Sequence, residues 1–188
     1  MLYDLLTILF TQVRPLVKGE KRVPAKEFKT LRKPESAIED HTQFATEFFG
    51  LLGGHFEPVG KVFGEEDHAA TVAEERHGDG GHVLFRPVGQ KIFVQVFAHL
   101  CAENSLQNAM ARLSLLPTDL CQAPYASVIW DCDRKTMVTS STASSLCRDV
   151  LLHMLGEKTR RSTDKLRQRY CDFLGEPREA GELPEPIA

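Results

Sequence analysis

The stretch HGDGGHVLFRPVGQKIFVQVFAHL, residues 77–100, places a polar, glycine-rich segment directly before a hydrophobic run. Pro87 suits the first turn of a helix, because a backbone N–H has no partner within the helix at that position. Apolar residues then recur at helical spacing, at Val88, Ile92, Phe93, Val96, Phe97 and Leu100. The stretch predicts a core helix from Pro87, preceded by a short strand-like piece, HVLF, and by a hinge at residues 77–81.

Similar signals predict helices on both sides of this run. Apolar periodicity followed by a stop indicates helices within residues 2–19, 35–54, 105–117, 146–156 and 162–175. Two β-rich pieces flank a polar turn, DCDRK, and predict a hairpin at about residues 126–139. We therefore expect a mainly α (α+β) fold, a helical domain with one small β-hairpin. The expected core is Leu6, Leu9, Phe48, Phe85, Phe93, Phe97, Leu113, Ile129, Trp130, Leu151 and Leu155.

The distribution of charge and glycine predicts how the chain is organised. Residues 1–56 form an N-terminal helical segment, and residues 57–82 are an acidic, glycine-rich linker or loop that offers the best internal boundary. Residues 83–175 form a C-terminal helical region that contains the hairpin. Residues 176–188 are acidic and proline-rich, and we expect them to be disordered.

Composition restricts the classes of protein to consider. The net charge of −3 gives no general attraction to nucleic acid, so such binding would need a local basic patch. The five cysteines form no CxxC pair, which disfavours a zinc ribbon or a disulfide framework and fits a reducing compartment. The first helix is too short and too polar to span a bilayer. We expect a cytoplasmic protein without membrane contact.

The loop RHGDGGH contains the residues most suited to chemistry. His77, Asp79 and His82 are acceptable ligands for zinc, manganese or iron, which would suit a small metal-dependent nuclease or hydrolase. Their spacing matches no known metal-binding motif, and the glycines indicate flexibility, so a solvated hinge is the favoured interpretation. No catalytic residue and no cofactor are assigned, and we expect a non-catalytic protein.

Two basic patches could contact nucleic acid. The first lies between Arg14 and Lys33 and contributes Lys21, Arg22, Lys29 and Arg32. The second contains Arg161, Lys165 and Arg169, which stand four residues apart and would share one helix face. Such a row could neutralise phosphates, but a solvated helix face is the more common explanation and the favoured one.

The order of several motifs resembles a known family. The motifs are LFRPVGQ from Leu84, ARLSLLPTDLCQAPYASVIWD from Ala111, MVTSS from Met137, LCRDVLLHMLG from Leu146 and LRQRYCDFLG from Leu166. Residues 83–174 resemble the C-terminal part of bacterial DGQHR-domain proteins, the group that includes the Dnd-type regulator of DNA sulfur modification. The N-terminal YDLLTILFTQVRPLVKGEKR resembles the helices that precede this part.

The chain departs from this family in its defining motif, Asp-Gly-Gln-His-Arg, which is absent. We interpret the chain as the helical C-terminal half alone, either a split or truncated member or a subunit that pairs with a separate core. The resemblance implies a non-catalytic interaction or regulatory protein associated with DNA modification or phage defence. Its partner would be a DGQHR-bearing core or a DNA-modification complex, with possible DNA contact. A metal-dependent enzyme and a stand-alone nucleic-acid-binding protein are the alternatives.

Overall fold

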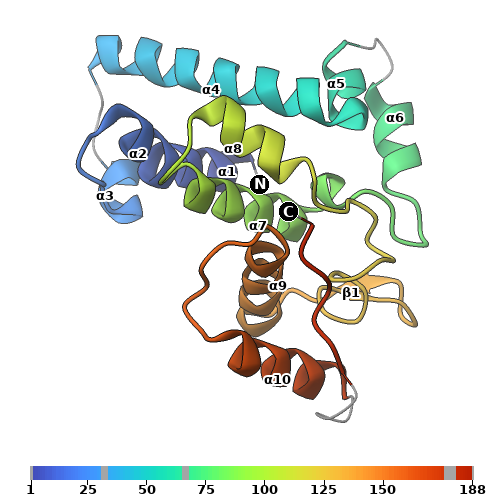
Figure 1. Ribbon diagram of the computed structural model, residues 1–188. Helices are drawn as coiled ribbons and strands as arrows, with labels where there is room; N and C mark the ends of the chain where they lie inside the picture. Colours follow the sequence, from blue (N-terminus) through green and yellow to red (C-terminus); the bar gives the residue numbers. More distant parts are fainter. Residues whose placement is uncertain (1, 31–33, 65–67, 176–180, 188) are drawn as a thin grey trace. The chain divides into compact units, whose positions relative to one another are not determined.

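The computed structural model describes residues 2–30, 34–64, 68–175 and 181–187. The described chain is mainly helical with one two-stranded antiparallel hairpin, which confirms the predicted fold class (Figure 1). It divides into two compact units: the first comprises residues 1–71 and 94–114, the second residues 72–93 and 115–188. Helix α7, Pro87–Leu100, begins at the predicted proline and contributes residues to both units.

The first unit begins with a helical run that widens in its middle. Helix α1 (Leu2–Ile8) continues into a π-helical turn (Leu9–Val13) and then into α2 (Arg14–Lys18). The N–H of Arg14 bonds to the carbonyl of Leu9, five residues back. Pro15 explains this turn, because its ring displaces the carbonyl four residues before it and a wider turn relieves the clash. The run ends at Gly19, as predicted, with φ of 65°.

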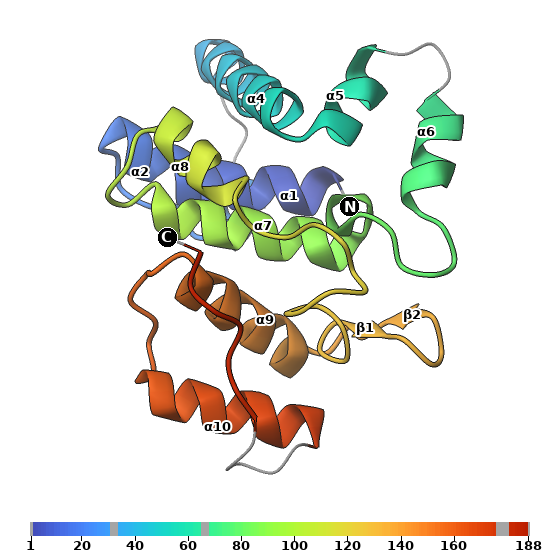
Figure 2. The same cartoon turned by 45° about the vertical axis from the view of Figure 1, so that its right-hand side comes forward.

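Helix α4 (Glu35–His55) is the longest element of this unit. Phe44, Phe48 and Leu52 form its buried stripe, and α4 packs along α8 (Leu106–Leu113) (Figures 1 and 2). The ring centroid of Phe48 lies 5.3 Å from that of Phe97 in α7. The helix runs one residue beyond Gly53–Gly54, where the sequence predicts its end. Helix α3 (Ala25–Thr30) lies within the first basic patch.

Two short helices occupy most of the segment that the sequence predicts as a linker or loop. These are α5 (Glu57–Gly64) and α6 (His68–Glu75). A Cβ added to Gly60 would lie 2.6 Å from the carbonyl oxygen of Gly53, so this glycine permits close packing of α5 on α4. The contact joins residues of two different helices and cannot be seen in the sequence. Gly60 therefore looks like a loop signal in the sequence, although it belongs to a helix.

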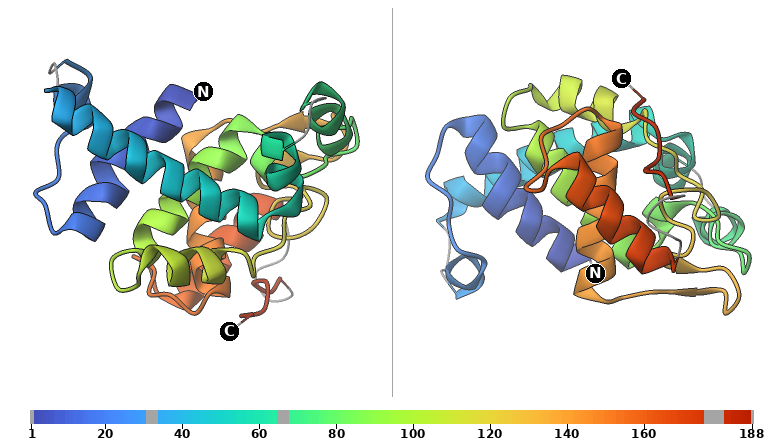
Figure 3. Two further views of the ribbon diagram at one scale, coloured as in Figure 1. Left: turned by 90° about the horizontal axis from the view of Figure 1, so that it is seen from above. Right: turned by 60° about the horizontal axis from the view of Figure 1, so that its bottom comes forward.

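The second unit contains the hairpin and two further helices. Strands β1 (Trp130–Asp131) and β2 (Thr136–Met137) pair with Trp130 opposite Met137. Helices α9 (Ser141–Met154) and α10 (Thr163–Leu174) follow, and they contact each other (Figure 2 and the right-hand view of Figure 3). The piece HVLF, expected to be strand-like, is so only at His82, which forms an isolated antiparallel bridge with Asp119, whereas Val83–Phe85 form a 3-10 turn.

A buried carboxylate joins α9 to the chain around α10. Asp149 is 1% exposed. Its Oδ1 accepts a bond of 2.6 Å from Arg148, and its Oδ2 lies 3.0 Å from Arg161 Nη1 and 3.7 Å from Arg169 Nη1. Because Asp149 is buried, its negative charge is compensated by these arginines and not by water. The arginines therefore contribute to the stability of this unit.

The expected core and the expected tail differ in part from the structure. Leu6 and Phe85 are only half-buried, whereas the other expected core residues are buried. Residues 176–180 of the tail lie outside the described residues. Residues 181–187 contain no helix or strand, yet the N–H of Ile187 donates to the carbonyl of Met154 at 2.7 Å. That part of the tail is bonded to the end of α9.

Candidate functional site

The predicted metal ligands do not converge. His77 and Asp79 are exposed, whereas His82 is buried. The Nδ1 atom of His82 accepts the N–H of Leu84 at 3.1 Å, and the Asp79 carboxylate pairs with Lys135 from the hairpin. Within the described ranges, no group of three or more His, Cys, Asp or Glu residues is arranged to hold a metal ion.

The loop that contains these residues is held by contacts and does not resemble the expected flexible hinge. Arg86 Nη2 donates to the carbonyl oxygens of His77 and Gly80, both at 2.9 Å. The Arg86 guanidinium lies 5.2 Å from the centroid of the Trp130 ring. Burial of this guanidinium lowers the pKa of Arg86. These contacts fix the loop on the hairpin, so Arg86 has a structural role.

Two glycines allow the loop to adopt this conformation. Gly80 and Gly81 have φ of 122° and 80°, values that L side chains rarely adopt. A Cβ at Gly80 would lie 2.8 Å from Cys121 Sγ, and a Cβ at Gly81 would lie 2.3 Å from the carbonyl oxygen of Glu75. The glycines are thus required by close packing, which the sequence pattern alone does not distinguish from flexibility.

The second basic patch differs from the predicted row. Lys165 is exposed in the first turns of α10, but Arg161 precedes that helix. Arg161 and Arg169 both lie against the carboxylate of Asp149. Burial, and then the nearby Arg161, lower the pKa of Arg169. Two of the three predicted phosphate contacts are therefore engaged within the protein.

The first basic patch is spread over α3 and the segment before it. Lys21 and Arg22 are exposed between α2 and α3. Lys29 Nζ lies 4.8 Å from the centroid of the Tyr3 ring, which is a cation–π contact. Arg32 lies outside the described residues.

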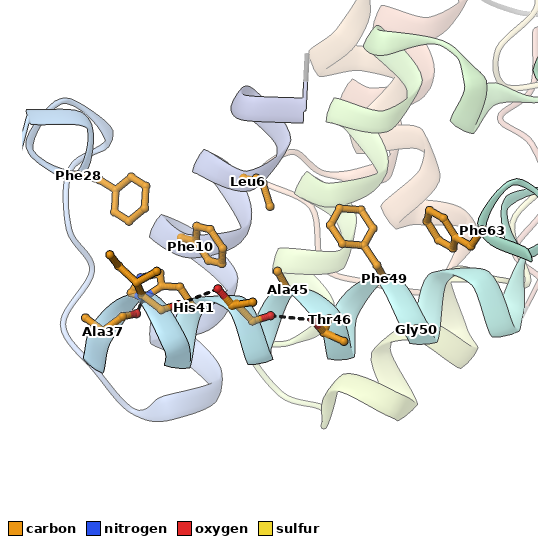
Figure 4. A pocket seen from close by; sticks show the side chains of 12 residues that line it. Leu6, Phe10, Phe28, Ala37, His41, Ala45, Thr46, Phe49, Gly50 and Phe63 are labelled. Atoms are coloured by element: carbon orange, nitrogen blue, oxygen red, sulfur yellow. Dashed lines mark hydrogen bonds between the residues drawn. The ribbon is translucent and has the colours of Figure 1, made fainter. Parts of the chain in front are cut away.

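An apolar groove of about 700 Å³ lies in the first unit, at a place that the sequence did not single out (Figure 4). Residues of α1, the π turn, α3, α4 and α5 line it: Leu6, Phe10, Phe28, Ala37, Ile38, His41, Thr42, Ala45, Thr46, Phe49, Gly50 and Phe63. Ile38 and Phe63 are 54% and 55% exposed, so the groove is open to solvent. The wide apolar surface of α4 is the sequence signal that could have indicated it.

Aromatic rings lie at both ends of the groove. At one end, the Phe28 end, the ring centroid of Phe10 lies 5.8 Å from that of Phe28 and 4.7 Å from that of His41. At the other, the Phe63 end, the centroids of Phe49 and Phe63 are 6.0 Å apart. Such rings provide large apolar contact areas with little side-chain freedom to lose on binding.

The polar groups of the groove are already satisfied. The hydroxyl of Thr42 donates to the carbonyl of Ile38, and that of Thr46 donates to the carbonyl of Thr42, both at 2.9 Å. His41 Nδ1 donates to the carbonyl of Ala37. Among the described residues that line the groove, none carries a carboxylate or a thiol. This arrangement suits the binding of an apolar surface better than it suits acid–base or nucleophilic chemistry.

Comparisons with protein families, with curated proteins and with solved structures find no match to this chain. Across the part of the chain that the structure describes, none of the helices has the length and apolar character needed to cross a membrane.

The packing of the glycine loop can be tested with a matched pair of substitutions. Gly81→Ala should lower the free energy of unfolding by about 1–3 kcal/mol, because the new Cβ meets the carbonyl of Glu75 at positive φ. Gly78→Ala in the same loop should be neutral or stabilising by up to roughly 1 kcal/mol, because nothing lies within 4 Å of its added Cβ. Urea unfolding of both variants measures the difference. Equal effects would mean that the loop is a hinge.

The burial of His82 predicts a dependence of stability on pH. Burial lowers its pKa from 6.5 to about 4, so between these values the unfolded chain binds a proton that the folded chain does not. Stability should therefore fall as the pH drops from 6.5 towards 4, by up to roughly 3 kcal/mol from this group. His82→Asn keeps an acceptor for Leu84 N–H and should reduce the slope. Urea unfolding at several pH values tests this, and an unchanged slope would contradict it.

Proposed function

We propose that this chain is a non-catalytic interaction protein that binds a partner protein through the groove of its first unit. The observation that carries the proposal is the open apolar groove, which presents aromatic rings at both ends. Apolar surface of this kind is unfavourable in water, and burying it against a partner contributes about 25 cal/mol per Å² of apolar area. The satisfied hydroxyls of Thr42 and Thr46 add no desolvation cost that a partner would need to offset.

We further propose that the partner belongs to a bacterial DNA-modification or phage-defence system. The support is the resemblance of residues 83–174 to the C-terminal part of DGQHR-domain proteins. Since the Asp-Gly-Gln-His-Arg motif is absent from this chain, a separate protein that carries the DGQHR core is the partner we expect. In this proposal the chain regulates or recruits that partner and performs no reaction itself.

Two other functions have less support from the described contacts. A metal-dependent enzyme would use His77, Asp79 and His82, of which Asp79 pairs with Lys135 and His82 is buried. Nucleic-acid binding through the second basic patch would require Arg161 and Arg169 to leave Asp149. Metal analysis of the purified protein tests the first alternative, and the salt dependence of DNA binding tests the second.

A matched pair of glycine substitutions on α4 tests the groove. Both Gly50 and Gly54 are exposed, with nothing within 4 Å of an added Cβ, but Gly50 lines the groove and Gly54 does not. Gly50→Trp should fill the groove and reduce capture of the partner at least about tenfold, whereas Gly54→Trp should leave capture unchanged. The measurement is affinity capture from the native host with quantitative mass spectrometry, using tagged full-length protein.

Circular dichroism and thermal melting of both variants provide the control for folding. Neither substitution should destabilise the protein, because replacing an exposed helical glycine removes its unfavourable helix propensity. Equal capture by the two folded variants would contradict a binding role for the groove. A captured partner that carries no DGQHR core or DNA-modification function would contradict the second half of the proposal and leave the first intact.

A further inference from the structure

The spacing of the aromatic ends limits what the groove can hold. His41, at the Phe28 end, and Phe49, at the Phe63 end, are eight residues apart on α4, which places them about 12 Å apart along the helix axis (Figure 4). A helix that lies in a groove presents apolar residues at i, i+3 or i+4, and i+7, so its outer anchors are about 10.5 Å apart. The two spacings match closely enough for one anchor to enter each aromatic end.

The centre of the groove has small side chains. Ala45 and Thr46 lie between the aromatic ends, whereas Gly50 lies one residue beyond Phe49, at the Phe63 end. Small residues allow the backbone of another helix to approach closely, as they do where helices pack together. Ala45 and Thr46 are therefore the small residues at the place where the central turn of a bound helix would lie.

The walls of the groove favour a helix over an extended peptide. Every described lining residue belongs to α1, the π turn, α3, α4 or α5, so the described walls offer no free strand edge. An extended segment would find no backbone partners there for its N–H and C=O groups, as it would at the edge of a sheet. A helix satisfies those groups internally.

Charges beside the groove differ between its two sides. On α4, Glu39 is exposed and follows Ile38 of the lining; it also borders a shallower hollow that includes Thr42 and Thr46. At the Phe28 end, Lys29 follows Phe28 on α3 and lies over the Tyr3 ring. A bound helix with basic residues along α4 and an acidic residue at the Phe28 end would complement both charges.

From these observations we propose that the groove binds an amphipathic α-helix of a partner protein. Its apolar anchors at i and i+7 enter the Phe28 and Phe63 ends, a small or medium residue at i+3 or i+4 faces Ala45 and Thr46, and a basic residue faces Glu39. This inference rests on the proposed function, because it specifies what the same groove recognises.

Two peptide display libraries test the proposal on the full-length protein. One fixes a helix of about 16 residues and varies its apolar and flanking positions, and the other presents the same composition on an extended hairpin scaffold. Selection should enrich helical clones with apolar residues at i, i+3 or i+4, and i+7. These clones should bind Gly50→Trp at least about tenfold more weakly than they bind wild type or Gly54→Trp.

The charge prediction has its own matched control. Glu39→Lys should weaken the selected helices about threefold to tenfold, whereas Glu103→Lys, also exposed in the first unit, should leave their affinity unchanged. Equal effects of the two substitutions would overturn the proposed orientation of the helix.

The outcomes also separate this inference from the proposed function. The proposal of a bound helix would be overturned if the selection enriched extended clones that distinguish Gly50→Trp from Gly54→Trp. It would also be overturned if the helical clones failed to distinguish these two variants. If the natural partner still distinguished the two variants, the groove would remain a binding site for another shape of ligand. If neither the natural partner nor the selected peptides distinguished Gly50→Trp from Gly54→Trp, both proposals would fail.

Discussion

The packing of the first unit depends on which part of the apolar surface of α4 is buried. Its stripe of Phe44, Phe48 and Leu52 is buried, with Phe48 against Phe97 of α7. Successive residues on a helix are turned by about 100° around its axis. When this stripe is buried, the adjacent stripe, which includes Ala45 and Phe49, therefore lies to the side of the buried contact. The apolar surface of α4 is wider than one contact face, and the groove is the part that remains uncovered.

In the second unit, charged groups link separate segments of the chain around a buried apolar core. Arg86 fixes the glycine loop by bonding to its carbonyls and lying over Trp130. Asp149 binds three arginines, two of which lie twelve or more residues further along the chain. Arg161 and Arg169, which the sequence suggests as phosphate contacts, are thus engaged within the fold. Function is therefore better sought in the groove than in these residues.

The sequence predicted the ends of helices where residues close in the sequence determine those ends. Pro87 begins α7, Gly19 ends the first helical run, and Ser140 accepts the N–H of Ala143 at 3.1 Å to cap α9. Elements that depend on tertiary contacts were not predictable in this way. Gly60 is helical because it packs on Gly53, and Arg161 turns to Asp149 and does not extend the row of Lys165.

The groove could be predicted only in part. The apolar residues of α4 are visible in the sequence, but periodicity does not show which of its stripes will be covered. The π turn also contributes, because it carries Phe10, which lines the groove. Its cause, Pro15, is visible in the sequence, yet helical periodicity alone predicts an uninterrupted helix there. The basic patches were more conspicuous, but three of their cations contact neighbours: Lys29 lies over Tyr3, and Arg161 and Arg169 lie against Asp149.

The most direct test of a helix bound in the groove is site-specific photocrosslinking in the native host. Benzoylphenylalanine would replace Ile38, which is 54% exposed at the edge of the groove, or Gly54, which lies on the same helix away from the lining. The account predicts a crosslinked partner from position 38 alone, joined through a segment with apolar residues at i, i+3 or i+4, and i+7. Identical products from both positions, or a crosslinked segment without that spacing, would contradict it.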